Sequence, residues 1–322
     1  MQRPLKPATS ILEQIEILES RNMRVDKPLA RQWLSNVSYY RLSAYSYPAR
    51  VFGTDGQRTD MFQKGTSFSD VTGLYEADRK LRTLFHDAIE RIEVSLRTRL
   101  IEVLSSHGPL AYREATTFRP SFDHEKWIKT VDSRIERARP SNDAIKHYAE
   151  KYGNQYPFWV AAEVLDFSDI SQAFRGLYSI QQRQVSESLG FIFALEHLGK
   201  SQSLKAKKNS PLTTWFHQLT VLRNTCAHHS RLWNRSYVPA TTTALRTMQK
   251  FRQLPEEQSE RIFGALVVSA HILEVVSPHT SWPMKVEKLL GDDFLSNPLV
   301  EPAAMGIPDD WDGKLALLPG CQ

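Results

Sequence analysis

Hydrophobic residues recur at intervals of three and four along most of the chain, which is the spacing of one face of an α-helix. The longest such pattern covers Leu81–Leu104 and stops at His107-Gly108-Pro109, where glycine and proline interrupt a helix. Another apolar helix is predicted over Ile262–Val276. We find no internal repeat and no series of alternating, strand-like segments, so the pattern predicts an all-α fold.

Two short helices are predicted before residue 40. Apolar residues recur at helical spacing over residues 11–18, and Asp26 is a suitable N-cap for a second helix with Pro28 in its first turn. The pair would fit a DNA-binding helix-turn-helix or a helical hairpin packed on the main body. Because the second helix offers only Lys27 and Arg31 as basic residues, the hairpin is the better interpretation.

Four segments interrupt the helical period. Residues 46–70 contain Asp55-Gly56, which can turn a hairpin, so a small β-hairpin and an irregular loop both fit. Residues 120–150 are polar and predict one helix with loops. The basic segment 199–210 has few apolar residues and predicts a loop, and the tail from residue 298 is rich in proline and glycine and is expected to wrap the surface.

These elements suggest three parts. We expect residues 1–70 to form an N-terminal helical hairpin followed by a connecting segment, which is either the small β-hairpin or a loop. A helical domain then covers residues 71–290, and a tail packed on the surface covers residues 291–322.

Composition narrows the class of protein. The chain has 322 residues with 41% hydrophobic and 24% charged residues, and its 14 glycines and 17 prolines are too few for a collagenous or generally disordered protein. The net charge of +5 permits a polyanionic partner without requiring one. Only Cys226 and Cys321 are present, so we expect a reducing compartment and no disulfide framework. The N-terminus does not resemble a signal peptide, and no apolar stretch approaches the roughly 20 residues that span a bilayer. We therefore expect a cytoplasmic protein without a membrane partner.

One dense group of polar residues is a candidate for chemistry. The chain has no Gly-rich phosphate loop and no H-E-x-x-H, so we expect no metal and no cofactor. Within residues 213–235, Arg223, Asn224 and His228 lie on one predicted helix, with His229 directly after them. Five residues separate Arg223 from His228, which is about 7.5 Å along a helix axis and about 140° around it. One helix therefore does not bring both groups to one phosphate unaided, whereas a second copy across a two-fold axis could supply the missing pair.

The residue types favour RNA chemistry. An imidazole exchanges protons near neutral pH, and a guanidinium can neutralise a crowded phosphate with two parallel hydrogen bonds. Without a metal motif, these groups suit cleavage that uses the 2′-hydroxyl of RNA as nucleophile. Taken alone, an arginine and a histidine on a helix are more often an ordinary solvated pair.

Two other polar groups could serve a functional site, but each has a more common structural explanation. The charged stripe on the long helix is more often a solvated face than the lining of a site; its members are Arg79, Arg82, His86, Glu90, Glu93 and Arg97. The aromatic and basic group Tyr39, Tyr40, Arg41 and Tyr45 could stack on RNA, but such tyrosines more often pack a helix junction. Arg41 is the member that deserves a test.

Several blocks, in order along the chain, resemble one family. The run Leu222–His229, followed by Arg231–Arg235, resembles the signature of abortive infection (Abi) proteins of the AbiD/AbiF type, which belong to the HEPN superfamily. Further blocks that resemble this family are Tyr39–Tyr45, Leu74–Arg82, Ile89–Arg97, Phe158-Trp159 with Glu163, and Met305–Trp311.

The resemblance implies a HEPN-like helical bundle and an activity. Its R-x-x-x-x-H motif would cut RNA without metal, as a phage-defence toxin, at a site formed by two copies of the chain. Arg223 and His228 would be the catalytic pair, with Asn224 as their polar neighbour and with Glu93 and Arg97 as supporting residues. Side chains that could bind RNA are Tyr40, Arg41, His229, Arg231 and Arg235.

The resemblance also implies RNA partners. RNA would be the substrate, and a small noncoding RNA could be an inhibitor or a guide-like partner. The alternative is a non-catalytic protein that holds a structured noncoding RNA, which explains the basic charge and the aromatic residues equally well.

Overall fold

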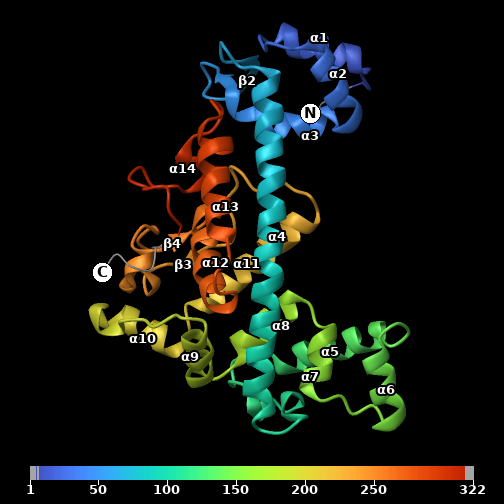
Figure 1. The fold of residues 1–322 in the computed structure, drawn as a ribbon, viewed down its shortest axis with the longest axis vertical. Coiled ribbons are helices and arrows are strands. Elements are labelled where there is room, and N and C mark those ends of the chain that lie inside the picture. Colours follow the sequence, from blue (N-terminus) through green and yellow to red (C-terminus); the bar gives the residue numbers. More distant parts are fainter. Residues whose placement is uncertain (1–4, 6, 316–322) are drawn as a thin grey trace.

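The computed structural model describes residue 5 and residues 7–315, and one helix dominates it. Helix α4, Phe68–Ser105, has 38 residues and runs through the length of the molecule (Figure 1). Ser67 begins it with a capping box, because its hydroxyl accepts the backbone N–H of Asp70 while the Asp70 carboxylate accepts the N–H of Ser67. The apolar stripe predicted from the sequence is buried along α4, and the helix ends just before Gly108, whose φ is +121°.

The N-terminal elements cover the first turns of α4 (Figure 1). They are α1 (Ile11–Ser20), α2 (Lys27–Asn36), α3 (Tyr39–Ser46), the 3-10 turn Tyr47–Ala49, and strands β1 (Arg50–Phe52) and β2 (Arg58–Phe62). The two strands form an antiparallel hairpin in which Arg50 pairs with Phe62. The Asp26 side chain caps α2 by accepting the backbone N–H of Leu29 at 3.0 Å. The predicted helix pair and the β-hairpin are therefore confirmed.

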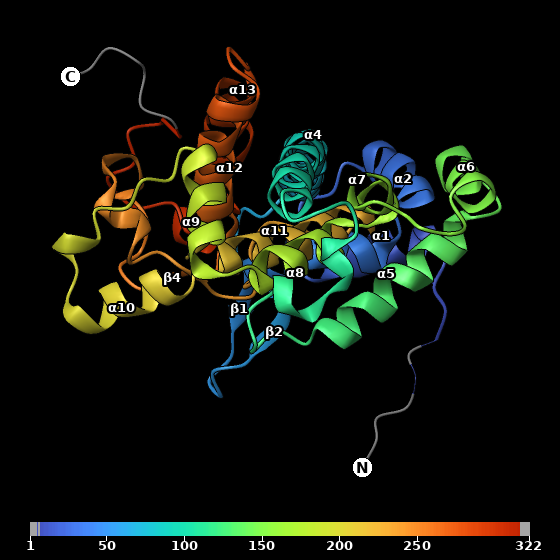
Figure 2. The same cartoon turned by 90° about the horizontal axis from the view of Figure 1, so that it is seen from below.

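The remaining helices pack around the middle and far end of α4 (Figures 1 and 2). Helices α8 (Phe167–Gly176), α11 (Leu212–Ala227), α12 (Ile262–Val276) and α13 (Trp282–Leu289) contact it directly. Other helices are α5 (His124–Ala138), α6 (Asp143–Lys151), α7 (Phe158–Ala161), α9 (Ser179–Ser188), α10 (Lys200–Lys208) and α14 (Pro302–Met305). A second small sheet pairs β3 (Ala240–Thr241) with β4 (Gln258–Ser259), and a π-helical segment spans Leu290–Leu295.

The all-α class is confirmed, with two local corrections. Residues 120–150 form two helices, α5 and α6, instead of one. The predicted loop at residues 199–210 is wrong, because residues 200–208 form α10. This segment consists mostly of Lys, Ala, Gln and Leu, which are strong helix formers, and it lacks apolar periodicity because none of its residues is buried. Within the described part of the chain, no helix is long and apolar enough to cross a membrane.

The C-terminal segment is fixed more firmly than a surface tail. Met305 and Ile307 are both buried, and the indole of Trp311 packs edge-on against the ring of Phe263 on α12. Gly306, at φ +80°, ends the short helix α14. The described end of the chain therefore contributes to the core.

Candidate functional site

The predicted catalytic residues lie at the C-terminal end of α11. Leu219, Leu222 and Cys226 anchor this helix in the core, because all three are buried. Arg223 is half-buried, whereas Asn224 and His228 are exposed. The Nη1 of Arg223 donates a hydrogen bond to the Oδ1 of Asn224 at 3.3 Å, so these two neighbours are in contact.

The helix ends immediately after His228 in a Schellman motif. The backbone N–H of Ser230 donates to the carbonyl of Thr225, and that of His229 donates to the carbonyl of Cys226, both at 2.9 Å. His229 has φ +53°, a left-handed conformation that glycine usually takes at this position. This turn directs the chain away from α11 and leaves both adjacent imidazoles exposed.

Arg223 faces the middle of α4. Burial raises the pKa of Glu93, and the charges of Arg97 and then of Arg223 act against that rise, so the charge of Arg223 acts on this carboxylate. Glu93 accepts a hydrogen bond from the Nη2 of Arg97 at 2.7 Å, and the same nitrogen donates to the carbonyl of Leu165 at 3.1 Å. The two residues that the resemblance assigns a supporting role thus form an ion pair whose carboxylate is under the influence of the predicted catalytic arginine.

The charged stripe on α4 divides into two kinds of residue. His86 and Glu90 are exposed, as a solvated face requires. Arg82 is buried, and the side chains of Glu93 and Arg97 are only 16% and 14% exposed. The stripe is therefore not a uniformly solvated face, because α8, α11 and the segment after α11 pack against part of it.

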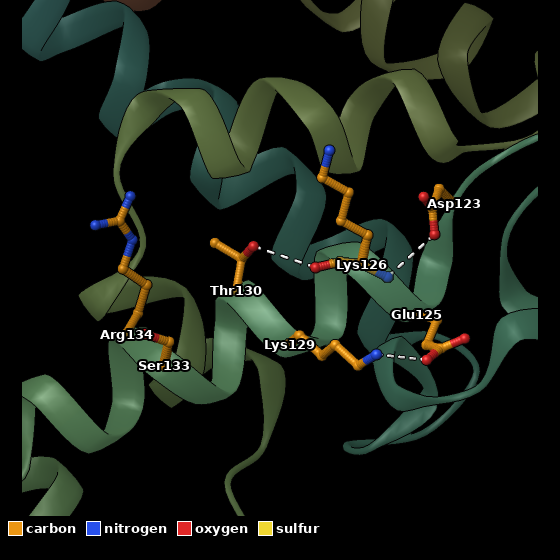
Figure 3. A pocket seen from close by; sticks show the side chains of 7 residues that line it. All are labelled: Asp123, Glu125, Lys126, Lys129, Thr130, Ser133 and Arg134. Atoms are coloured by element: carbon orange, nitrogen blue, oxygen red, sulfur yellow. Dashed lines mark hydrogen bonds and ion pairs between the residues drawn. The ribbon is translucent and has the colours of Figure 1, made fainter.

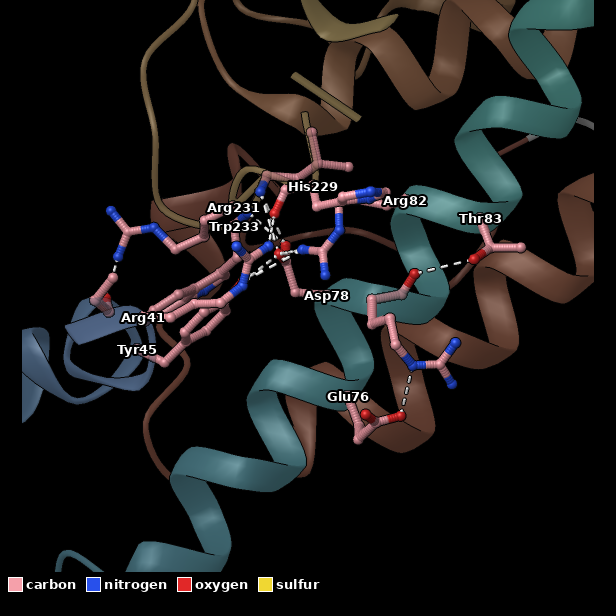
Figure 4. A network of polar contacts seen from close by, with 12 residues as sticks. Arg41, Tyr45, Glu76, Asp78, Arg82, Thr83, His229, Arg231 and Trp233 are labelled. Carbon is pink, nitrogen blue, oxygen red and sulfur yellow. Dashed lines mark hydrogen bonds and ion pairs between the residues drawn. The ribbon is translucent and has the colours of Figure 1, made fainter. Parts of the chain in front are cut away.

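A buried carboxylate holds the segment that follows the motif (Figure 4). Asp78 of α4 is completely buried and accepts the backbone N–H groups of Leu232 at 3.1 Å and Trp233 at 2.8 Å. It also accepts the hydroxyl of Tyr45 at 2.7 Å and pairs with the guanidinium of Arg82. Burial raises the pKa of Asp78, and Arg82 and these hydrogen bonds oppose that rise. The network joins α3, α4 and the segment after α11 at one carboxylate.

The predicted RNA-binding residues have different surroundings. The Nη2 of Arg41 donates to the carbonyl of His229, and the Nη1 of Arg231 donates to the carbonyl of Ala44 (Figure 4). Both guanidiniums therefore connect α3 to the segment after α11. Arg235 and Tyr40 are exposed, Tyr40 to 88%.

The packing predicted for the tyrosines holds for one and fails for another. Tyr45 is buried and its hydroxyl is bonded to Asp78, as expected for a helix junction. Tyr40 points into solvent, because the faces of α3 that pack on α4 are filled by Leu42 and Tyr45.

Sequence reasoning missed Asp78 as a structural anchor. Its i, i+4 spacing to Arg82 on an apolar helix could have indicated a buried ion pair. The backbone amides that bind Asp78 lie more than 150 residues further along the chain, and no local sequence pattern predicts such a contact.

A broad hollow on α5 does not include the predicted site. It is lined by Asp123, Glu125, Lys126, Lys129, Thr130, Ser133 and Arg134 (Figure 3). Lys129 pairs with Glu125, and Arg134 pairs with Asp166 and Asp169. Most of its positive charge is thus neutralised locally, and the hollow is not a strongly basic groove.

The geometry of one chain separates the two predicted catalytic groups. Arg223 lies toward Glu93 and α4, whereas His228 is exposed at the helix end. An α-helix places residues five apart about 140° apart around its axis. Two copies of the end of α11, one from each of two chains, could together bind a single phosphate, with the guanidinium from one copy and the imidazole from the other.

Comparison with known proteins identifies a family. The family model described as "Abi-like protein" matches residues 32–234, more than half of the chain. The matched region begins in α2, includes all of α4, α8 and α11, and ends one residue after Trp233. No curated protein and no protein of solved structure gives a significant match.

Proposed function

The chain belongs to the Abi-like protein family, and from this premise we propose that it is an endoribonuclease of the HEPN type that acts in abortive infection. The observation that carries the proposal is an unbroken R-x-x-x-x-H motif at an exposed helix end inside the family match. The charge of Arg223 acts on Glu93, which is paired with Arg97, and His228 is open to solvent.

Each residue has a distinct chemical task in this proposal. His228 takes the proton of the 2′-hydroxyl or donates one to the leaving 5′-oxygen. General acid–base catalysis of this kind raises the reaction rate roughly 10²–10⁴-fold. Arg223 donates hydrogen bonds to the phosphate, whose charge increases as the 2′-oxygen attacks. Asn224, in contact with Arg223, holds the guanidinium or the phosphate in place. The products are a 2′,3′-cyclic phosphate and a free 5′-hydroxyl.

The site is completed by a second copy of the chain. Since Arg223 and His228 leave α11 on different sides, two helix ends related by a two-fold axis bring the arginine of one subunit to the histidine of the other. The exposed residues at this helix end are Asn224, Ala227, His228 and His229. We therefore propose a cytoplasmic homodimer, a toxin against RNA that a small noncoding RNA could restrain.

RNA incubated with the purified protein in EDTA tests the proposal. We expect 5′-labelled single-stranded RNA to be cut, with product 3′ ends that lack a free 3′-hydroxyl until the cyclic phosphate is opened and the remaining phosphate is removed. An otherwise identical DNA strand lacks the 2′-hydroxyl and should stay intact. Absence of cleaved RNA under conditions in which the protein is folded and dimeric would reject the nuclease.

Measuring the binding of the same labelled RNA at several salt concentrations tests the non-catalytic alternative. A protein that only holds RNA would bind it tightly without product, and log K would fall with log salt by about 0.7 per neutralised phosphate for a single strand. Salt-sensitive binding with intact RNA would therefore select the RNA-holding function over the enzyme.

A further inference from the structure

A cavity lies behind the segment that follows α11, apart from Arg223 and His228. It has a volume of about 390 Å³, which is in the range of small-ligand sites. Its walls come from four separate parts of the chain. They are Pro48, Ala49, Arg58 and Gln63 around the β-hairpin, Trp233 and Asn234 after α11, Arg261 before α12, and Pro298, Leu299, Glu301, Ala303 and Ala304 near α14.

Two guanidiniums in this cavity lack a carboxylate partner. Arg58 and Arg261 are half-buried, and neither forms an ion pair within residue 5 and residues 7–315. Arg58 is nevertheless held in place, because its Nη1 donates to the carbonyls of Pro48 and Arg50 at 2.7 and 2.6 Å. Its guanidinium also lies 4.2 Å from the ring centre of Phe52. A half-buried cation whose charge no carboxylate neutralises favours an anionic ligand, and a guanidinium matches phosphate oxygens in geometry.

The cavity also offers free neutral hydrogen-bonding groups. The side-chain amides of Gln63 and Asn234 form no hydrogen bond with any other described residue, and each carries both a donor and an acceptor. Trp233 contributes part of the cavity wall. Glu301 adds one exposed carboxylate that can accept hydrogen bonds from sugar hydroxyls. An inorganic anion could use the N–H donors of this cavity but would leave its amide and carboxylate acceptors unused.

We propose that this cavity binds a nucleoside phosphate, with the phosphate between Arg58 and Arg261. The base and ribose meet the amides of Gln63 and Asn234 and the carboxylate of Glu301. The ligand could be a free mononucleotide or the terminal nucleotide of an RNA strand, because both present the same groups. This inference does not depend on the proposed nuclease, since none of Arg223, Asn224 and His228 lines the cavity.

Calorimetric titration of the full-length His228→Ala variant tests this site without RNA cleavage. The probes are AMP, GMP, CMP and UMP, inorganic phosphate, and a 5′-phosphorylated octaribonucleotide. We expect at least one monophosphate to bind with one-to-one stoichiometry and more tightly than inorganic phosphate. If the octamer binds with the same dependence on the variants below, the ligand is an RNA end; if only monophosphates do, it is a free nucleotide.

Two further substitutions, made in the same background, locate the binding. Arg261→Gln should weaken the nucleotide about tenfold or more, because it removes a charged hydrogen-bond donor. Arg31→Gln removes the same charge from an exposed position on α2 and should change affinity less than twofold. Ala304→Leu narrows the cavity without a change of charge and should abolish binding while thermal unfolding stays cooperative.

Several results would overturn the proposal. They are no binding of any monophosphate at millimolar concentration, inorganic phosphate binding as tightly as the nucleotides, or affinities that neither Arg261→Gln nor Ala304→Leu changes. Because the protein used already lacks His228, none of these results bears on RNA cleavage, and failure of the nuclease proposal would leave this site standing.

Discussion

At the scale of single residues, buried charge decides where the segment after α11 lies. Asp78 and Arg82 form an i, i+4 pair on α4 whose side chains are 0% and 6% exposed. The same helix carries a second i, i+4 pair, Asp87 with Arg91, in which the aspartate is 56% exposed. The two pairs have the same chemistry and spacing and differ in burial, so they form a natural control for each other.

Asp78→Asn should destabilise the fold by about 3–5 kcal/mol, because it leaves Arg82 buried without a counter-charge. It also replaces the carboxylate that accepts the backbone N–H groups of Leu232 and Trp233 with an amide. Asp87→Asn should cost less than about 1 kcal/mol, since an exposed pair contributes little. Chemical denaturation of both variants measures the difference. Equal losses in the two variants would show that the Asp78 network does not hold the molecule together.

His271 makes stability depend on pH. It is buried on α12, donates a hydrogen bond from its Nε2–H to the carbonyl of Gly190 (3.0 Å), and lies near Lys250 and Glu274. Burial, helped by the charge of Lys250, lowers its pKa to about 4. Because an unfolded histidine titrates near 6.5, the stability from the neutral ring is full above that pH and is lost as the pH falls toward 4.

The free energy of unfolding should therefore drop by about 2 kcal/mol between pH 7.5 and pH 5 on account of His271 alone. His271→Gln should remove that part of the drop, whereas substitution of the exposed His86 by glutamine should leave it. Urea titrations at the two pH values provide the comparison. A drop of the same size in His271→Gln would contradict the assignment.

Residue-level prediction from sequence succeeded where chemistry is local. The motif itself places Arg223, Asn224 and His228 at one helix end, and the structure agrees with the expected helix. The roles of Arg41 and Arg231 as links to backbone carbonyls depend on contacts across almost 190 residues. Such contacts are set by the tertiary fold, so the sequence alone does not reveal them.

At the scale of elements, the end of α11 determines how the candidate site is presented. His229 adopts the left-handed conformation at the position where a helix usually ends in glycine. Its carbonyl accepts the guanidinium of Arg41, which fixes the turn from the outside. The helix end is thus held by backbone geometry and by α3.

His229→Gly should be more stable than His229→Ala by about 1 kcal/mol, because alanine is strained at φ +53° and glycine is not. Both variants lose the imidazole, so their comparison isolates the backbone term. Thermal unfolding of the two proteins side by side gives the answer. An alanine variant as stable as the glycine variant would mean that the turn relaxes out of this conformation.

Elements with a buried face were predictable, and exposed ones were not. α4 and α12 follow from apolar periodicity because their packing requires it. The pattern predicts a loop where α10 lies because α10 has no buried residue and hence no apolar periodicity, although its composition favours a helix. Asp55-Gly56 left a β-hairpin and an irregular loop both open, and the chain forms the hairpin, with Gly56 at φ +72°.

At the scale of the whole molecule, the proposal requires two copies of the chain. One α11 presents its arginine toward α4 and its histidine to solvent, so a complete site needs a second helix end. The division of the chain into residues 1–70, 71–290 and 291–322 stays a prediction from the sequence. The N-terminal elements are nevertheless tied to the segment after α11 through Asp78, Arg41 and Arg231.

Mixing two inactive variants tests the shared site. Arg223→Ala and His228→Ala should each lose RNA cleavage, and co-expressed subunits that form mixed dimers should regain activity at least tenfold above either variant alone. The regained site would combine the histidine of one subunit with the arginine of the other. Sedimentation must show that mixed dimers form. Mixed dimers without regained cleavage would indicate that each chain uses its own pair.

The central claim is that His228 moves a proton during RNA cleavage. The most direct measurement is the single-turnover cleavage rate of the His228→Ala variant beside that of wild type, with His197→Ala as a control for loss of an exposed histidine outside the motif. We predict a rate at least about 100-fold lower for His228→Ala, with unfolding unchanged, and a wild-type rate for His197→Ala. A His228→Ala protein that cuts RNA as fast as wild type would contradict the account.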